Sequence, residues 1–318
     1  MKYSAYVTVV MPAHDAQRWI HAAISSVLNQ TWKDFELWIL ENGSTDNTAN
    51  IARSFDDPRI RVFELGPIGF QKALQYAIEN AKSPWLARMD ADDISFPERL
   101  AQQVRVLSAE PDCVFVGTDF AHLTPSGHII EQLPTAESCF VDAKLLGSGA
   151  RRFGDPTVVF NRQAARDVGG VDSEFTMGDV PLLFRLLKRG KAWQIGCPLY
   201  LYRHNQTSMS SNLAFREQAY RARVKYAPEC LLNLAQPRKS SFWSRIALWE
   251  ILAGDRDAAR VAIQNMEKQE GFIEGARKLH VRSWLGPIAP PFYRYKYRHK
   301  WRHRPDWEKS LCGYELSG

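Results

Sequence analysis

The feature that most constrains the fold is a short apolar run that ends in three carboxylates. Residues 85–89 form a strand-like segment, and Asp90, Asp92 and Asp93 follow it at once. Open α/β sheets bind their ligands at the carboxyl ends of strands. Carboxylates this close repel one another unless a cation or hydrogen-bond donors neutralise them, and such oxygen ligands suit Mg²⁺ or Mn²⁺. A metal site is one interpretation, and a solvated acidic turn before the helix that begins near Pro97 is the other.

The segments before these acids alternate between strand and helix patterns. Apolar, β-branched runs alternate with stretches whose apolar residues recur at helical spacing. Asp15 is expected to cap the first of these helices. The rhythm predicts an α/β fold with a mostly parallel sheet flanked by helices. The expected strands are 6–11, 35–40, 59–65 and 85–89, and the expected helices are 16–29, a short one near 51–55, and 70–81.

Polar side chains follow three of these strands directly. His14 and Asp15 come after the first, Glu41 and Asn42 after the second, and the acids from Asp90 after the fourth. Parallel strands end on one edge of a sheet, so these groups are expected to converge on a ligand, for which a nucleotide has a suitable size. Taken singly, each has a structural alternative as a turn residue or a helix cap. No glycine-rich dinucleotide or P-loop motif is present.

Composition limits the classes of protein to consider. The 318 residues include no apolar run long enough to cross a membrane, and the run before Pro12 is too short for a signal peptide. Five scattered cysteines favour reduced thiols and a cytoplasmic protein. The net charge of +6 is uneven, because residues 1–212 carry 21 Lys and Arg against 24 Asp and Glu, whereas residues 213–318 carry 20 against 11. By charge, the first two thirds is not a nucleic-acid binder.

Residues 5–212 resemble the family 2 glycosyltransferases, which have the GT-A fold. The resemblance runs through successive blocks at 7–16, 26–31, 35–37, 42–46, 57–60 and 87–93, and continues at 155–160 and 168–172. It implies a nucleotide-sugar donor, usually a UDP-sugar, and a D-x-D motif made by Asp90, Ala91 and Asp92. Asp92 would ligate Mg²⁺ or Mn²⁺, and Asp90 would touch the ribose or the metal. The further residues implied at the donor site are Pro12, Ala13, His14, Asp15, Glu41 and Asn42.

Residues 175–190 predict a helix that begins at Asp179. From the residues alone, Asp179 is a helix N-cap. The resemblance implies instead that it is the catalytic base of a single displacement with inversion. Acids that the family usually carries are replaced here by Gly178 and Pro181, and Glu41 and Asp155 are further departures. These departures keep open a second hypothesis, an inactive donor-binding scaffold that uses its helical, basic tail to recruit partners or a membrane.

Three further residues are candidates to contact the donor phosphates or the metal. Lys72 is placed to meet the donor pyrophosphate or is a solvated helix lysine. Arg203 could neutralise the diphosphate. His204 reaches the metal or the donor phosphates, or is a surface-loop histidine.

The last third of the chain has a different character. Residues 213–285 predict an α-helical extension, and residues 286–318 form a basic, aromatic tail. Aromatic and basic residues alternate over 293–304, a pattern that suits an anionic membrane surface. The same pattern could also bind nucleic acid, but we do not expect nucleic acid as a partner. A solvated tail is the structural alternative. We therefore expect a cytoplasmic protein, with peripheral contact at the inner face of the membrane as one interpretation.

Together these features predict an enzyme that moves a sugar to an acceptor hydroxyl. The resemblance and the basic tail suggest a glycan or lipid-linked acceptor in the synthesis of a surface polysaccharide or glycolipid. Nucleotidyl transfer on the same framework is a third hypothesis, and it differs by releasing pyrophosphate.

Overall fold

The computed structural model describes residues 6–124, 129–131, 137–148, 153–175 and 179–204, together with 218, 221, 222, 225, 226, 257, 260, 263 and 264. The chain divides into two compact units, of which the first comprises Met1–Leu123 and Glu131–Arg238 and the second Thr124–Ile130 and Lys239–Gly318. The first unit contains the central sheet and the helices that cover it. The tail at 293–304 and most of the predicted helical extension lie outside the described residues.

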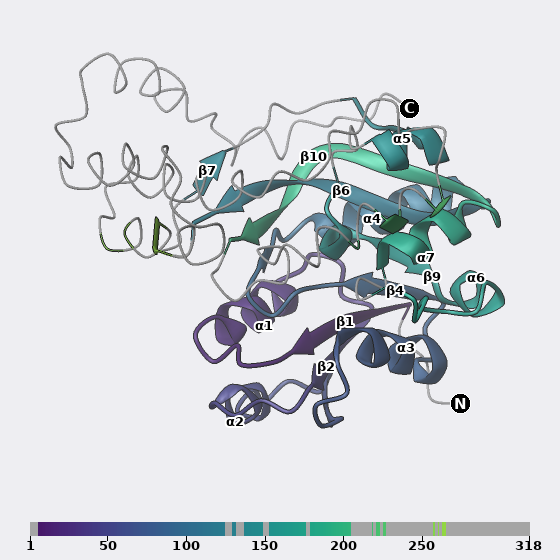
Figure 1. The fold of residues 1–318 in the computed structure, drawn as a ribbon. Coiled ribbons are helices and arrows are strands. Elements are labelled where there is room, and N and C mark those ends of the chain that lie inside the picture. The colour runs from purple at the N-terminus through teal and green to yellow at the C-terminus, as the bar shows by residue number, and fades with distance from the viewer. Residues whose placement is uncertain are drawn as a thin grey trace, which may run out of the picture. The chain divides into compact units, whose positions relative to one another are not determined.

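A mixed β-sheet lies at the centre of this unit, and one half of the sheet is mostly parallel (Figure 1). Its strands follow the order β3-β2-β1-β4-β9-β6-β10-β5, and β8 pairs with β10. The first four in this order are mutually parallel, and so are β6 and β10. Strands β9, β5 and β8 pair antiparallel with their neighbours. The predicted α/β class is confirmed. The strands are β1 (Val7–Ala13), β2 (Phe35–Glu41), β3 (Ile60–Glu64), β4 (Trp85–Arg88), β5 (Ile94–Ser95), β6 (Cys113–Leu123), β8 (Cys139–Val141), β9 (Val159–Asn161) and β10 (Lys191–Arg203). The short strand β7 (Ile129–Glu131) belongs mostly to the second unit.

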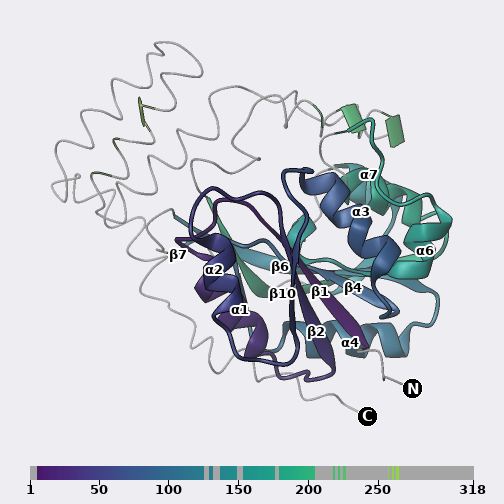
Figure 2. The ribbon, with the colours of Figure 1, turned by 90° about the horizontal axis from the view of Figure 1, so that it is seen from below.

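Helices cover both faces of the sheet (Figure 2). One face carries α3 (Phe70–Asn80), α6 (Arg162–Asp167) and α7 (Asp179–Leu186). The other carries α1 (Ile20–Leu28), α2 (Thr48–Arg53) and α4 (Arg99–Ala109). The structure also contains the short helix α5 (Ala143–Ser148) and the 3₁₀ turn η1 (Asp155–Thr157). Within the described residues, no helix is both long and apolar enough to span a bilayer.

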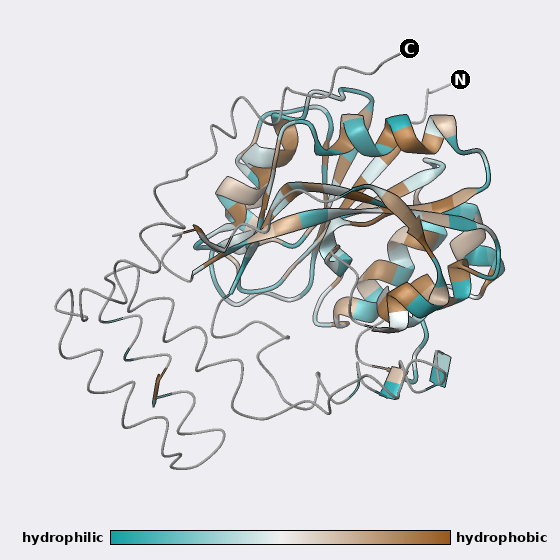
Figure 3. Cartoon of the chain, turned by 90° about the horizontal axis from the view of Figure 1, so that it is seen from above, coloured by the Kyte–Doolittle hydropathy of each residue, from teal (hydrophilic) through white to brown (hydrophobic). Residues whose placement is uncertain are grey.

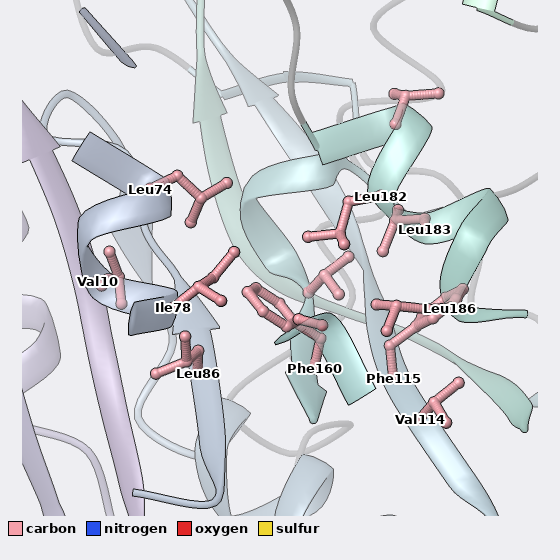
Figure 4. Packing of buried hydrophobic residues seen from close by; sticks show 14 of the residues in the cluster. Val10, Leu74, Ile78, Leu86, Val114, Phe115, Phe160, Leu182, Leu183 and Leu186 are labelled. Carbon is pink, nitrogen blue, oxygen red and sulfur yellow. The ribbon is translucent and has the colours of Figure 1, made fainter. Parts of the chain in front are cut away.

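Burial on both faces explains the continuous apolar strands. Parallel strands between two helical layers are shielded from water on each side, so they lack the alternation of a half-exposed strand. Figure 3 shows this as strands that are largely hydrophobic beside helices of mixed character. On the α3 side, Val10 and Leu86 pack with Leu74 and Ile78 of α3, and the leucines of α7 complete the cluster (Figure 4). Each such side chain contributes about 1.5–3 kcal/mol by leaving water.

The first helix begins later than predicted. Helix α1 starts at Ile20, and the residue at its N-cap position, Trp19, makes no side-chain capping bond. Asp15 adopts a left-handed backbone with φ of 47°. Its Oδ1 accepts a hydrogen bond from the Thr45 backbone N–H at 2.8 Å. The prediction of Asp15 as the helix cap is therefore wrong, because a contact with a distant loop holds its carboxylate.

Candidate functional site

The carboxyl ends of β1, β2 and β4 lie together on one edge of the sheet. In the parallel register Ala13 stands beside Glu41, and Val10 stands beside Arg88. The predicted site residues at or just beyond the strand ends on this edge are Pro12, Ala13, His14 and Asp15 from β1, Glu41 and Asn42 from β2, and Asp90, Ala91 and Asp92 after β4. The structure thus brings together the three strand ends that the sequence marks with polar groups.

The turns after β1 and β2 are joined by hydrogen bonds. His14 Nδ1 lies 3.1 Å from the Asn42 carbonyl oxygen. The Asp15 N–H donates to Ser44 Oγ at 3.1 Å, while Asp15 Oδ1 accepts from Thr45. These reciprocal bonds hold one turn against the other. Ser44 and Thr45 therefore shape the site, although nothing in their sequence position assigned them a role beyond a turn.

Glu41 is buried, and its carboxylate is held by its own turn. Oε1 accepts the Ser44 N–H at 2.5 Å. Burial pushes the pKa of Glu41 upward, but hydrogen bonds from Ser44 and Gly43 outweigh it, and the pKa lies below its ordinary value. The carboxylate is therefore ionised near neutral pH. It supplies a fixed negative charge beneath the turn at Asn42.

The turn at Asn42 also contacts the start of α3. Asn42 Oδ1 accepts the Gly69 N–H at 2.9 Å. Gly43 has φ of +73°, and a Cβ added there would lie 2.7 Å from Pro67 N. Only glycine allows both the left-handed backbone and this close approach. Lys72 lies in the first turn of α3 with an exposed side chain, on the helix whose start Asn42 holds.

The acids after β4 occupy unequal surroundings. Arg88 Nη2 donates to Asp90 Oδ1 at 2.8 Å, and the Arg88 guanidinium lies 4.6 Å from the centre of the Phe70 ring. Burial, followed by the negative charge of Asp90, raises the pKa of Asp92 to about 7, and nearby Arg203 opposes this rise. Burial and the charges of Asp92 and Asp90 raise the pKa of Asp93 well above its ordinary value.

Strand β10 supports the acidic turn from the side. Arg203 Nε donates to the Asp92 carbonyl oxygen at 2.7 Å, and the Arg203 N–H donates to Asp93 Oδ1 at 2.7 Å. The Asp90 N–H donates to the Tyr200 hydroxyl oxygen at 3.1 Å. Burial, followed by the charges of Asp93 and Asp90, holds the pKa of Tyr200 well above its ordinary range, so the hydroxyl keeps its proton.

Two of the supporting residues were missed by sequence reasoning for different reasons. Arg88 is a charge inside an apolar strand, and this local anomaly could have indicated a buried ion pair. Tyr200 lies 110 residues from Asp90 along the chain, and an apolar strand with two tyrosines gives no sign of that contact.

The two other predicted site residues lie on separate elements. His204 follows β10 and is buried, with Nε2 lying 2.6 Å from His122 Nδ1 and the two rings stacked. The backbone of Asp179 begins α7, as predicted, and residues 176–178 before it lie outside the described part of the chain.

The acids suit a cation that also binds substrate oxygens. Among the described residues, no group of three or more His, Cys, Asp or Glu side chains is placed to hold a metal ion alone. Mg²⁺ is commonly bound through one or two carboxylates, with substrate phosphates completing the shell. Asp90 and Asp92 offer such a pair, and the charge of Asp90 already disfavours ionisation of Asp92. A divalent cation would relieve that repulsion, so the donor set fits the predicted Mg²⁺ or Mn²⁺.

Known proteins resemble this chain in sequence and fold. A model of the family described as "Glycosyl transferase family 2" matches residues 8–153. The "O-antigen biosynthesis glycosyltransferase WbnJ" of Escherichia coli is 30% identical over 224 residues, which cover 67% of this chain and 85% of WbnJ. For seven further curated relatives, the chain spans only 13% to 42% of their length.

Two solved structures show the same fold at low identity. The structure of TarS 1–349 from S. aureus in complex with UDP-GlcNAc superposes with a TM-score of 0.60 at 15% identity, covering 87% of this chain and 88% of that chain. The mannosyltransferase PcManGT from Pyrobaculum calidifontis, in complex with GDP-Man and Mn²⁺, gives a TM-score of 0.52 at 17% identity and covers 92% of this chain and 84% of that one.

Proposed function

Because the chain belongs to glycosyl transferase family 2, we propose that it is a metal-dependent, inverting enzyme that moves a sugar from a nucleotide-sugar, in the first instance a UDP-sugar, to an acceptor hydroxyl. The observation that carries this proposal is the shared sheet edge, where Asp90 and Asp92 after β4 stand beside the interlocked turns after β1 and β2. This edge combines a cation site with a rigid surface for a nucleotide.

The nucleoside part of the donor is proposed to bind along the turns of β1 and β2. Pro12, Ala13, His14 and Asp15 line one side, and Glu41 and Asn42 line the other. The Glu41 carboxylate already accepts the Ser44 N–H, so it presents a fixed acceptor to a base N–H. The proposal of UDP is supported by TarS, whose structure contains UDP-GlcNAc, whereas PcManGT contains GDP-Man.

The diphosphate is proposed to lie over the acidic turn. Asp92 would hold Mg²⁺ or Mn²⁺, with Asp90 and His204 as further candidate ligands and Ala91 against the donor. When bound, the cation would neutralise the charge that develops on the departing diphosphate. Lys72 on α3 and Arg203 at the end of β10 are the candidate side chains for additional positive charge near the phosphates.

Asp179 is proposed to accept the acceptor proton. The acceptor oxygen forms a bond to the anomeric carbon as the bond from that carbon to the diphosphate breaks, and the hydroxyl proton passes to Asp179. A carboxylate at the start of a helix is stabilised in its ionised form by the helix dipole. A single displacement of this kind inverts the anomeric configuration.

The acceptor class is proposed from a relative. WbnJ is named for O-antigen biosynthesis, so a growing surface polysaccharide or a glycolipid is the first acceptor to test.

Residues 293–304 are proposed to bring the enzyme to an anionic membrane surface from the cytoplasm. Sedimentation with anionic and with neutral vesicles, compared between the full chain and a chain ending at 285, tests this: equal sedimentation of the two chains contradicts it.

A donor panel tests the central proposal. Purified protein is incubated with UDP-, GDP- and dTDP-sugars, with Mn²⁺ or with a chelator, and released nucleotide is measured. We expect Mn²⁺-dependent release of a nucleoside diphosphate from one donor class. Saturable donor binding without release would instead indicate the inactive scaffold. Release of pyrophosphate would indicate nucleotidyl transfer.

A further inference from the structure

The sheet ladder ends just before the acidic turn. The Met89 N–H still donates to the Val10 carbonyl oxygen of β1 at 3.1 Å. The next backbone donor, Asp90 N–H, donates to the Tyr200 hydroxyl oxygen instead, at 3.1 Å. At the point where the chain leaves the sheet, the hydrogen-bond acceptor for its backbone is therefore a side chain of β10 and no longer a carbonyl of β1.

The Tyr200 ring is fixed by its surroundings. It is fully buried, and the Arg99 guanidinium lies 5.3 Å from its centre. Arg99 Nη1 donates to the carbonyl oxygens of Arg88 at 3.0 Å and Pro156 at 3.3 Å. Helix α4 thus fixes this guanidinium between β4 and η1. A ring packed in this way cannot turn its hydroxyl away from Asp90 without disturbing three elements.

The backbone beyond Asp90 is held by the same strand. Arg203 contacts the Asp92 carbonyl oxygen and Asp93 Oδ1, and Ser95 of β5 pairs with Tyr200 itself. The Arg203 contacts act on residues 92 and 93, whereas the Tyr200 hydroxyl accepts the amide N–H of Asp90. The direction of the Asp90 side chain depends on the orientation of this peptide unit, because the Cα–Cβ bond follows the backbone.

We propose that Tyr200 is a positioning residue whose hydroxyl, by accepting the Asp90 N–H, holds the turn that aims the carboxylates of Asp90 and Asp92 at a divalent cation. The inference rests on the proposed function, because it assigns the cation to this turn. Tyr200 itself is fully buried. It acts through the backbone of Asp90, as outer residues around metal sites orient the ligands.

Tyr200→Phe is the matching variant, because it removes the hydroxyl and keeps the ring against Arg99. Tyr76→Phe is the control, since Tyr76 lies on α3 and packs against Trp38 and Phe63. Two quantities are compared with the wild type: the affinity for Mn²⁺ in the presence of UDP, by electron paramagnetic resonance, and the hydrogen–deuterium exchange rate of the Asp90 amide in metal-free protein. Melting temperatures of both variants report any general loss of stability.

We expect Tyr200→Phe to bind Mn²⁺ about tenfold more weakly and to exchange the Asp90 amide faster, while Tyr76→Phe changes neither. Unchanged exchange at Asp90 overturns the inference, and so does faster exchange with unchanged Mn²⁺ affinity. Equal losses in both variants also overturn it, because they indicate a general effect on stability. A wild-type protein that binds no Mn²⁺ with UDP, GDP or dTDP contradicts the proposed function itself, and is thereby distinguished from a failure confined to the variant.

Discussion

Arg88 Nη2 lies 2.8 Å from Asp90 Oδ1, and Arg88 is nearly fully buried beneath Phe70. A buried guanidinium thus offsets the charge of one of the two paired aspartates. At the other, Arg203 Nε binds the backbone oxygen of Asp92. The two carboxylates therefore have different surroundings, and in the proposed cation site we expect the one that is paired with Arg88 to contribute less to cation binding.

The first prediction concerns these two carboxylates. Asp92→Asn should lower the affinity for Mn²⁺ more than Asp90→Asn, and it should abolish metal-dependent transfer. The reason is that Asp90 shares its charge with Arg88, whereas Asp92 would be the main ligand. Calorimetric titration of each variant with Mn²⁺ and UDP measures the difference. Equal losses in both variants would show that the ion pair does not divide the roles.

A second prediction follows from the raised pKa of Asp92, which lies at about 7 because of burial and the charge of Asp90. Below that pH, Mn²⁺ must displace a proton from the carboxyl group. The apparent affinity for Mn²⁺ should therefore rise about tenfold per pH unit up to neutral pH and then level off. Titration at about pH 6 in buffers of different ionisation enthalpy should reveal proton release that is absent at about pH 8.

The sign of the matching stability effect is opposite to that of an ion-paired aspartate. A carboxyl whose pKa is raised in the folded protein binds a proton more tightly there than in the unfolded chain. Metal-free protein should therefore lose stability as the pH rises through the interval between the ordinary pKa of 3.8 and about 7. Mn²⁺ should restore it, so the gain in melting temperature on adding Mn²⁺ should be larger at higher pH. A gain that shrinks with pH would contradict the assignment.

The sequence was sufficient for the layers of the fold and for the edge that carries the site. Helix α3 and the strands before Asp90 were recognisable because each buries a continuous or periodic apolar surface. Strand β9 was not predicted as the element between β4 and β6, since three residues carry too little pattern. The parallel alternation therefore stops at β4, and the rest of the sheet order depends on contacts that no local pattern encodes.

Within the site, the sequence located the polar groups and not their partners. Asp15 is a residue type that commonly caps helices, but its carboxylate accepts a hydrogen bond from Thr45, thirty residues away. The contact between Tyr200 and Asp90 joins residues that are 110 positions apart in the sequence. Such pairs follow from the register of the assembled sheet, and a single sequence does not reveal which distant residue will stand beside an aspartate.

The third prediction concerns Asp179. Asp179→Asn should keep the binding of Mn²⁺ and UDP and lose transfer, because the amide has no basic oxygen for the acceptor proton while its size is retained. Asp167→Asn is the control, an acid at the end of α6 whose surface ion pair with Arg189 is worth little. Binding by calorimetry and turnover by nucleotide release are measured on both. Wild-type turnover in Asp179→Asn would exclude this residue as the base.

The fourth prediction concerns two glycines near the proposed donor site, Gly43 and Gly66. It separates the free-energy cost of a left-handed backbone from the cost of a steric clash. Gly43 and Gly66 both have positive φ, +73° and +66°, but a Cβ at Gly43 would lie 2.7 Å from Pro67 N and one at Gly66 would meet nothing within 4 Å. Gly66→Ala should cost about 1–2 kcal/mol of unfolding free energy, from the left-handed backbone alone. Gly43→Ala should cost more, because the turn and the loop before α3 must also move apart.

Urea unfolding of the two variants measures both costs, and the difference between them isolates the close approach to Pro67. This movement of the turn should also shift Asn42, a residue of the proposed donor site. Asn42 Oδ1 accepts the Gly69 N–H at the start of α3, so the same displacement strains this hydrogen bond. UDP affinity should therefore fall in Gly43→Ala and stay near the wild-type value in Gly66→Ala. If both variants lose the same stability and the same affinity, the contact with Pro67 is not what shapes the turn, and backbone strain alone accounts for the glycine at position 43.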